Sequence, residues 1–224
     1  MRDPAHISAS ILNADFTQLG HEVDRAVAAA VDSIHLDVMD GHFVDNISFG
    51  PVVVESLRPR TQLPFHTHLM IERPLQYLDE FLAAGSDLVV CHVEALDDPA
   101  AVINAAHGAG RQVGVALNPE TAAEAVYPYL TDIQLLLVMT VQPGFGGQPF
   151  RTEVLPKVRA LRAEIEGRGL SVPIGVDGGV NLETIGPAYR AGAEVMVAGK
   201  GLYQAAGDLS PVVVALRSAA NATD

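Results

Sequence analysis

Hydrophobic and polar positions alternate along several short stretches of the chain. Between Ser33 and Met39, isoleucine, leucine and valine alternate with serine, histidine and aspartate. Residues two apart share a face of a β-strand, so one face of this segment is apolar and the other carries an imidazole beside a carboxylate. Comparable short runs recur along the chain. The predicted strands are His6–Leu12, Ser33–Met39, Phe65–Met70, Asp87–Val93, Gln112–Asn118, Leu135–Val141, Pro173–Gly179 and Val195–Lys200.

Longer segments with apolar residues at helical spacing separate these strands. Three of the predicted helices end in alanine followed by a glycine, at Gly85, Gly110 and Gly192, shortly before the next strand. Glycine at this place suits the left-handed conformation that often ends a helix. The predicted helices are Ala14–Val31, Leu75–Ala84, Ala100–Ala109, Thr152–Arg168 and Leu182–Ala191.

The alternation of strands and helices predicts an α/β fold, a single (β/α)8 TIM barrel over residues 1–224. Eight strand–helix units give about 28 residues per unit, which matches the size of such barrels. A doubly wound open sheet is the alternative, but it has five or six strands and would leave units unplaced. No low-complexity linker divides the chain, so we expect one domain. The chemistry is then expected at the carboxyl ends of the strands.

The composition indicates a large apolar core and argues against two classes of partner. The chain is 49% hydrophobic and 18% charged, with 27 acidic against 14 basic residues and a net charge of −13. Lys and Arg are scattered, whereas a nucleic-acid surface needs them clustered. No run of about 18 apolar residues marks a membrane span. We therefore expect neither a nucleic-acid nor a membrane partner.

The single cysteine, Cys91, lies in an apolar run and is expected to be a buried thiol. One cysteine cannot form an internal disulfide. The amino-terminal segment has no apolar stretch of signal-peptide length, and the chain is expected to be cytoplasmic.

Titratable side chains gather near the ends of three predicted strands. His35 and Asp37 share one strand, His66 and His68 share the next, and Asp177 lies on the seventh. A lone buried histidine is more often structural, but two buried aspartates need a cation or several donors. Imidazole nitrogen and carboxylate oxygen together suit Zn(II), Fe(II) or Mn(II). The pattern predicts a metal site, in which His68, nearer the loop than His66, is the favoured ligand.

Two further patterns point to a substrate pocket. Met39, Met70 and Met139 stand at strand ends, where they either fill the core or form an apolar collar that excludes water. Glycine-rich segments follow the last three strands, and barrels commonly bind phosphate through backbone N–H groups of these loops. Lys200 adds a cation in the same region. Together these features predict a small phosphorylated substrate.

The two aspartates suggest the chemistry. Asp37 and Asp177 are expected on opposite sides of the barrel mouth, one on each face of a substrate carbon. One would remove a proton and the other would return one to the opposite face, which inverts the stereocentre. Removal of the first proton leaves an enediolate intermediate. Its negative charge needs electrostatic stabilisation, which a metal supplies. Because one aspartate must be ionised while the other is protonated, their titrations are expected to be coupled.

Six motifs in order across nearly the whole chain resemble those of the ribulose-phosphate 3-epimerase family: "SASILNADF", "HLDVMDGHFV", "HLM", "LNP", "GFGGQ" and "VDGGV". The resemblance implies an isomerase that converts D-ribulose 5-phosphate to D-xylulose 5-phosphate in the pentose phosphate pathway. It also implies one divalent ion (Zn, Fe(II), Mn or Co) and a homo-oligomer.

When the motifs are matched one by one, the resemblance implies a role for each site residue. The implied metal ligands are His35, Asp37, His68 and Asp177, with Asp37 and Asp177 also the catalytic acid–base pair. The implied substrate-site residues are Ser10, Met39, Met70 and Met139. The implied phosphate-site residues are Gly144, Gly146, Gly147, Gly178, Gly179, Lys200 and Gly201.

The chain departs from the usual family pattern at four places, none of which removes an implied metal ligand. Ala9 and Asp45 stand where proline is usual, His66 where aspartate is common, and Lys200 where a small residue, usually serine, is expected. Lys200 is the departure that bears on phosphate geometry.

Two alternative functions stay open. The segment "VMTVQPGFGGQPF" is also similar to allulose-6-phosphate 3-epimerases, which leaves a six-carbon substrate in view. The "HTH" of the third strand resembles the paired histidines of metal-dependent hydrolases, which often carry a bridging lysine on strand four. The two lysines of this chain, Lys157 and Lys200, are not near that strand, which argues against a hydrolase.

Overall fold

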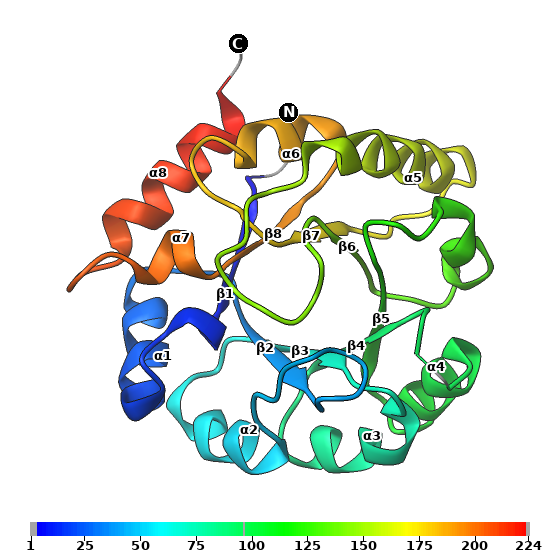
Figure 1. The fold of residues 1–224 in the computed structure, drawn as a ribbon, viewed down its shortest axis with the longest axis horizontal. Helices are drawn as coiled ribbons and strands as arrows, with labels where there is room; N and C mark the ends of the chain where they lie inside the picture. The colour runs from blue at the N-terminus through cyan, green and yellow to red at the C-terminus, as the bar shows by residue number, and fades with distance from the viewer. Residues whose placement is uncertain (1–3, 96, 223–224) are drawn as a thin grey trace.

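Eight parallel strands close into a barrel in the computed structural model of the protein, which describes residues 4–95 and 97–222 (Figure 1). Each strand pairs with its neighbours in sequence, and β8 pairs with β1 to complete the ring. The predicted (β/α)8 barrel is therefore confirmed. The strands are β1 (His6–Ser10), β2 (Ser33–Met39), β3 (Phe65–Met70), β4 (Leu88–His92), β5 (Gln112–Leu117), β6 (Leu135–Met139), β7 (Ile174–Asp177) and β8 (Val195–Ala198).

Helices surround the barrel on its outside (Figure 1). Five of the α-helices carry proline at their first or second residue, where its fixed φ suits the helix and its missing N–H costs nothing. The α-helices are α1 (Leu19–Ala28), α2 (Pro51–Leu57), α3 (Pro74–Ala83), α4 (Pro99–Gly108), α5 (Leu155–Gly167), α6 (Ile185–Ala191), α7 (Lys200–Tyr203) and α8 (Ser210–Asn221). The 3-10 helices are η1 (Ile11–Asn13), η2 (Phe16–Gln18), η3 (Arg58–Arg60), η4 (Ala123–Tyr129) and η5 (Thr152–Val154).

The connection between β5 and β6 differs from the expectation of one α-helix after each strand. It forms only the 3-10 helix η4, which contains Pro128. Proline lacks the N–H of an α-helical hydrogen bond and its ring clashes with the preceding turn, so this short segment does not continue as an α-helix. The helix α2 was not among the predicted ones, because its three consecutive valines are typical of strands.

The glycine positions that were predicted to end helices have the expected conformation. The φ angles of Gly85, Gly110 and Gly192 are 109°, 69° and 114°. Residues with a Cβ rarely adopt these values, so glycine is required for the chain to turn from each helix into the next strand.

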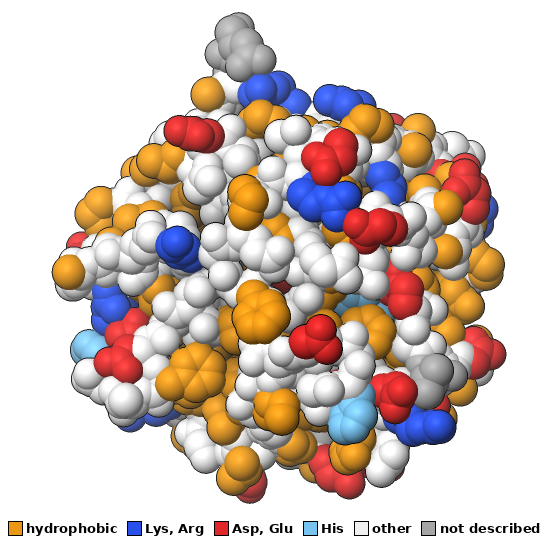
Figure 2. Space-filling view, in the orientation of Figure 1, with side chains coloured by type: hydrophobic (Ala, Val, Ile, Leu, Met, Phe, Trp, Pro, Cys, Tyr) orange, Lys and Arg blue, Asp and Glu red, His pale blue; other side chains and the backbone are white. Residues whose placement is uncertain are grey.

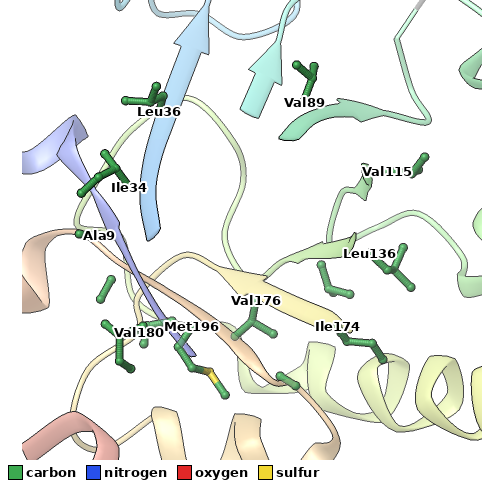
Figure 3. Close-up of a cluster of buried hydrophobic side chains, with 14 of the residues drawn as sticks. Ala9, Ile34, Leu36, Val89, Val115, Leu136, Ile174, Val176, Val180 and Met196 are labelled. Carbon is green, nitrogen blue, oxygen red and sulfur yellow. The ribbon is translucent and has the colours of Figure 1, made fainter. Parts of the chain in front are cut away.

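Apolar side chains pack on both faces of the barrel wall, because successive residues of a strand point to opposite sides. Figure 3 shows outward-facing members, such as Ile34, Val115 and Leu136, which lie in the layer between strands and helices. Cys91 lies in this layer and is buried, as predicted. A separate cluster occupies the barrel interior. Its members are Leu88, Val90, Ala116, Leu135, Leu137, Met139, Val195 and Val197.

The loop after β6 crosses in front of the barrel centre in Figure 1, where its lime colour marks it. Its backbone is joined to the loop after β2, because Asn46 Nδ2 donates a hydrogen bond to the carbonyl oxygen of Gly144 at 2.6 Å. Over the described ranges of the chain, no helix has the length and apolar character needed to cross a membrane.

Candidate metal centre and substrate pocket

Two histidines and two aspartates from three strands bring ligand atoms to one point. His35 and Asp37 lie on β2, His68 on β3 and Asp177 at the end of β7, and one atom from each lies within 4.8 Å of the others. Nε2 of His35 is 3.2 Å from Oδ1 of Asp37 and 3.5 Å from Oδ2 of Asp177. Nδ1 of His68 is 3.2 Å and 3.4 Å from the same two oxygens, and 3.4 Å from Nε2 of His35.

This spacing fits a divalent transition metal. The distances of 3.2–3.5 Å between each histidine nitrogen and the other ligand atoms are those of neighbouring ligands around one ion with bonds of about 2.0–2.2 Å. The histidine side chains are fully buried, and those of Asp37 and Asp177 are 4% and 13% exposed. Two buried carboxylates need positive charge beside them. Donor type, spacing and burial therefore agree on a cation site.

The electrostatics of the cluster also favour positive charge. Burial alone would lower the pKa of His35, but the carboxylates of Asp37 and Asp177 outweigh it and raise that pKa to about 10. The same carboxylates outweigh burial at His68, whose pKa is also raised. Burial opposes ionisation of both aspartates, yet the imidazoles of His35 and His68 hold their pKa values below the ordinary range. A metal ion would take the place of the protons that these groups attract.

The register of β2 and β3 explains why His68 reaches the cluster and His66 does not. His68 on β3 is paired with Asp37 on β2. His66 is paired with His35, two residues nearer the start of both strands. The ring of His66 stacks on that of His6, with centroids 5.7 Å apart, below the cluster. The preference for His68 as the ligand agrees with this geometry.

Two hydroxyl groups hold the aspartates in place. Ser10 Oγ donates a hydrogen bond of 2.6 Å to Oδ2 of Asp37, the oxygen that does not face the histidines. The single O–H of Thr140 Oγ1 is shared between the backbone carbonyl oxygens of Asp177 and Gly178, which lie 2.8 and 2.6 Å away. Asp37 is thus oriented through its carboxylate, whereas Asp177 is oriented through the backbone at the end of β7.

A pocket opens beside the cluster at the carboxyl ends of the strands. Asp37 and Asp177 line it, and His35 and His68 do not. The structure brings every residue predicted for substrate or phosphate to its wall. These residues are Ser10, Met39, Met70, Met139, Gly144, Gly146, Gly147, Gly178, Gly179, Lys200 and Gly201.

Glycines allow the pocket loops to approach one another closely. A Cβ on Gly147 would lie 2.8 Å from Cδ of Lys200, and one on Gly146 would lie 2.5 Å from the side-chain amide of Asn13. A Cβ on Gly199 would meet the same Asn13 side chain at 2.7 Å. Asn13 lines the pocket and was not predicted. It lies in the quoted "SASILNADF" motif, but nothing in the sequence indicates that it contacts loops from the other end of the chain.

His92 and Glu94 form a second group that the sequence analysis missed. Nε2 of His92 is 2.8 Å from Nε2 of His68, and Nδ1 of His92 is 3.0 Å from Oε2 of Glu94. Burial lowers the pKa of His92 to about 4, so this ring is neutral. The signal available in the sequence was a histidine and a glutamate two residues apart at the end of an apolar strand.

The fold and the site define a class: a (β/α)8 barrel with a buried cluster of two histidines and two aspartates beside a glycine-lined pocket at the carboxyl ends of its strands. The family model described as "Ribulose-phosphate 3 epimerase family" matches residues 6–203. The chain belongs to the ribulose-phosphate 3-epimerase family, which confirms the resemblance of the motifs.

Relatives named ribulose-phosphate 3-epimerase match along most of the chain. The protein of Bacillus subtilis is 44% identical over 198 residues, which cover 88% of this chain and 91% of the relative. That of Mycobacterium leprae is 42% identical over 216 residues, covering 96% and 95%. That of Methanocaldococcus jannaschii is 42% identical over 214 residues, covering 96% and 90%.

Solved structures with lower sequence identity share the fold. The 3-hexulose-6-phosphate synthase of Salmonella typhimurium superposes with a TM-score of 0.71 at 17% identity, covering 96% of this chain and 98% of the other. The phosphoribosyl anthranilate isomerase of Thermococcus kodakaraensis superposes with a TM-score of 0.67 at 16% identity, covering 97% and 99%. At these identities the likeness concerns the barrel alone.

Proposed function

We propose that the protein is a metal-dependent epimerase that interconverts D-ribulose 5-phosphate and D-xylulose 5-phosphate by inverting carbon 3. The observation that carries this proposal is the pair of carboxylates, Asp37 and Asp177, which meet beside one pocket within the cluster of metal-ligand type. They come from strands that β1 and β8 separate around the barrel. Membership of the ribulose-phosphate 3-epimerase family supports the choice of reaction.

In the proposed reaction the two aspartates handle one proton each. The ionised aspartate removes the proton from carbon 3, and the other, which starts protonated, delivers its proton to the opposite face of the same carbon. After one turnover the two protonation states are exchanged. The hydrogen bond from Ser10 to Oδ2 favours the ionised form of Asp37 and fixes its direction.

His35, Asp37, His68 and Asp177 are the proposed ligands of one divalent ion, Zn, Fe(II), Mn or Co. When bound, the ion stabilises electrostatically the negative charge that develops on the substrate oxygens. His35 and His68 hold the ligand atoms of both aspartates together. The buried site thereby keeps the two carboxylates at one point without leaving their charge uncompensated.

The rest of the pocket suits a sugar phosphate. Met39, Met70 and Met139 give it an apolar wall, which limits the access of water to a reactive carbanion. We assign the phosphate to the glycine loops, where backbone N–H groups and the ammonium group of Lys200 bind an anion. The loop after β6 contributes Pro143 to Gln148 to the pocket wall.

The hydrolase alternative lacks its bridging lysine. Lys157 donates hydrogen bonds to the carbonyl oxygens of Asn118 and Pro119 at 2.9 and 2.7 Å, after β5. Lys200 lies on the pocket wall after β8. Neither lysine belongs to β4, where a bridging lysine would be needed.

We also propose that the chain acts as one domain in a cytoplasmic homo-oligomer without a nucleic-acid or membrane partner. The single cysteine is buried and free, which suits a reducing compartment. On the face that Figure 2 shows, Lys and Arg side chains are spread out instead of gathered into a patch. The net charge of −13 repels nucleic acid. Light scattering on the purified protein tests the oligomer, with a monomeric mass as the contradicting result.

The proposed activity is tested with purified protein and two substrates. We expect conversion of D-ribulose 5-phosphate to D-xylulose 5-phosphate, with a lower kcat/KM for allulose 6-phosphate. A chelator should abolish the activity and added Zn, Mn or Co should restore it. A higher kcat/KM for allulose 6-phosphate would reassign the substrate, and full activity in protein shown by elemental analysis to lack metal would remove the metal from the proposal.

A further inference from the structure

A chain of side chains leads from the candidate metal centre to the loop after β5. His68 directs Nδ1 toward Asp37 and Asp177, and its other ring nitrogen, Nε2, lies 2.8 Å from Nε2 of His92. The two rings are stacked, with centroids 5.0 Å apart and planes 22° from parallel. A hydrogen bond between two neutral imidazoles needs one N–H and one lone pair, so only one of the two Nε2 atoms carries the hydrogen.

Glu94 decides which nitrogen carries it. Nδ1 of His92 is 3.0 Å from Oε2 of Glu94, and a carboxylate can only accept, so this nitrogen carries the N–H. In a neutral His92 the lone pair is then on Nε2, which accepts from His68. His68 therefore carries its hydrogen on Nε2 and keeps the lone pair of Nδ1 free toward the cluster. If His68 carried its hydrogen on Nδ1 instead, that N–H would point at the metal position.

Glu94 itself is held firmly. Its Oε1 accepts hydrogen bonds from the backbone N–H of Asn118, at 2.8 Å, and from the hydroxyl of Thr121. Its Oε2 is thereby left for His92. The side chain of His92 is fully buried, and the ring of Phe43 covers it with centroids 4.8 Å apart. Neither His92 nor Glu94 lines the substrate pocket, so both act through His68.

We propose that His92 and Glu94 are positioning residues that fix the tautomer and ring orientation of His68, so that its Nδ1 lone pair is presented to the metal. The inference rests on the proposed metal centre. His35 offers an internal contrast, because its Nδ1 is buried without a hydrogen-bond partner among the described residues. Removal of such supporting groups generally weakens metal affinity 10–100-fold.

The test compares Glu94→Leu with Thr121→Val. Both substitutions remove the hydrogen bond between Thr121 and Glu94 that tethers the loop after β5. Glu94→Leu also removes the acceptor for the backbone N–H of Asn118 and the acceptor for His92. We expect the Zn affinity, measured by chelator competition, to fall about 10–100-fold in Glu94→Leu and to stay within about twofold of wild type in Thr121→Val. Glu94→Gln, whose amide oxygen can still accept from His92, should keep most of the affinity.

Ring 15N NMR of the Zn-loaded protein reads the tautomers directly. In wild type we expect the hydrogen on Nδ1 of His92 and on Nε2 of His68; in Glu94→Leu the His92 hydrogen should move to Nε2 in part or whole. A wild-type His92 protonated at Nε2 would overturn the inference, as would equal losses of Zn affinity in Glu94→Leu and Thr121→Val, or no loss in Glu94→Leu. If wild type binds no divalent ion, the metal centre of the proposed function fails as well.

Discussion

The barrel interior has a polar half and an apolar half, although both are buried. The polar half consists of the polar inward-facing residues of β1 to β3: the partly buried His6 and the buried Ser8, Ser10, Ser33, His35, Asp37, His66 and His68. The apolar half consists of the interior cluster from β4, β5, β6 and β8: Leu88, Val90, Ala116, Leu135, Leu137, Met139, Val195 and Val197. Asp177 is the carboxylate that β7, which β8 separates from β1, adds to the cluster.

The two halves have different physical tasks. Polar groups cost free energy to bury unless they are paired, and the polar half pairs most of them, for example His6 Nε2 with Ser33 Oγ at 2.8 Å and Ser33 Oγ with Ser8 Oγ at 2.7 Å. Nδ1 of His35 and Nδ1 of His66 are buried without a partner among the described residues. Burial of each large apolar side chain stabilises the fold by about 1.5–3 kcal/mol. The apolar half thus offsets the cost of the polar half, which holds the groups capable of chemistry.

The largest expected effect concerns the carboxylates. Asp37→Asn or Asp177→Asn should lower kcat for ribulose 5-phosphate by a factor of about 10³ or more, because an amide cannot take up or deliver the carbon 3 proton. Steady-state kinetics on Zn-loaded protein of verified metal content provides the measurement. Near-normal turnover in either variant would show that the polar half does not supply the two bases.

In the apolar half we expect a loss of stability. Leu137→Ala should lower the free energy of unfolding by about 2–5 kcal/mol, because it leaves a cavity in a fully buried layer. Leu137→Met, which nearly keeps the volume, should cost less than about 1.5 kcal/mol. Urea denaturation of metal-free protein compares the two, and equal effects would mean that this half does not depend on close packing.

The strand pattern made much of this architecture predictable. Alternation identified all eight strands, and His35 and Asp37 stood out because imidazole and carboxylate groups are unusual on a buried strand. The contact of His92 with His68 was not predictable, because it depends on the stagger of β4 against β3. Asn13 was missed for a similar reason: it meets Gly146 and Gly199 only once the barrel closes.

The dependence of folding stability on pH should distinguish His66 from the histidines of the cluster. Burial, with repulsion from His35 and His6, lowers the pKa of His66 to about 3 in the folded protein, whereas the unfolded chain binds this proton near pH 6.5. Stability is therefore lost as pH falls from about 6.5 toward 3, and His66 should account for about 2 kcal/mol between pH 7 and pH 5. The raised pKa values of His35 and His68 have the opposite effect, a gain of stability as pH falls from 7 to below 6.5, and this gain is common to wild type and a variant that lacks His66.

Urea denaturation of metal-free wild type and His66→Leu at pH 7 and pH 5 measures this effect. The variant should lose less stability on acidification than wild type does. The same loss in both proteins would show that His66 is not kept neutral by the polar half.

The smallest expected effect lies at the pocket rim. Lys200→Ser should raise KM for the sugar phosphate about tenfold with little change in kcat, because one charge-assisted contact to the phosphate is lost. Lys200→Arg should restore most of the binding. If Lys200→Ser leaves KM and competitive inhibition by inorganic phosphate unaltered, the ammonium group does not contact the phosphate.

Solvent exchange at carbon 3 tests the arrangement of the two bases most directly. In D2O, wild type should place deuterium at carbon 3 of both ketose phosphates. Asp37→Asn and Asp177→Asn should lose interconversion, and each should retain slow exchange of one epimer only, a different one in each variant, because each remaining carboxylate reaches one face. Exchange of the same epimer by both variants would contradict the account.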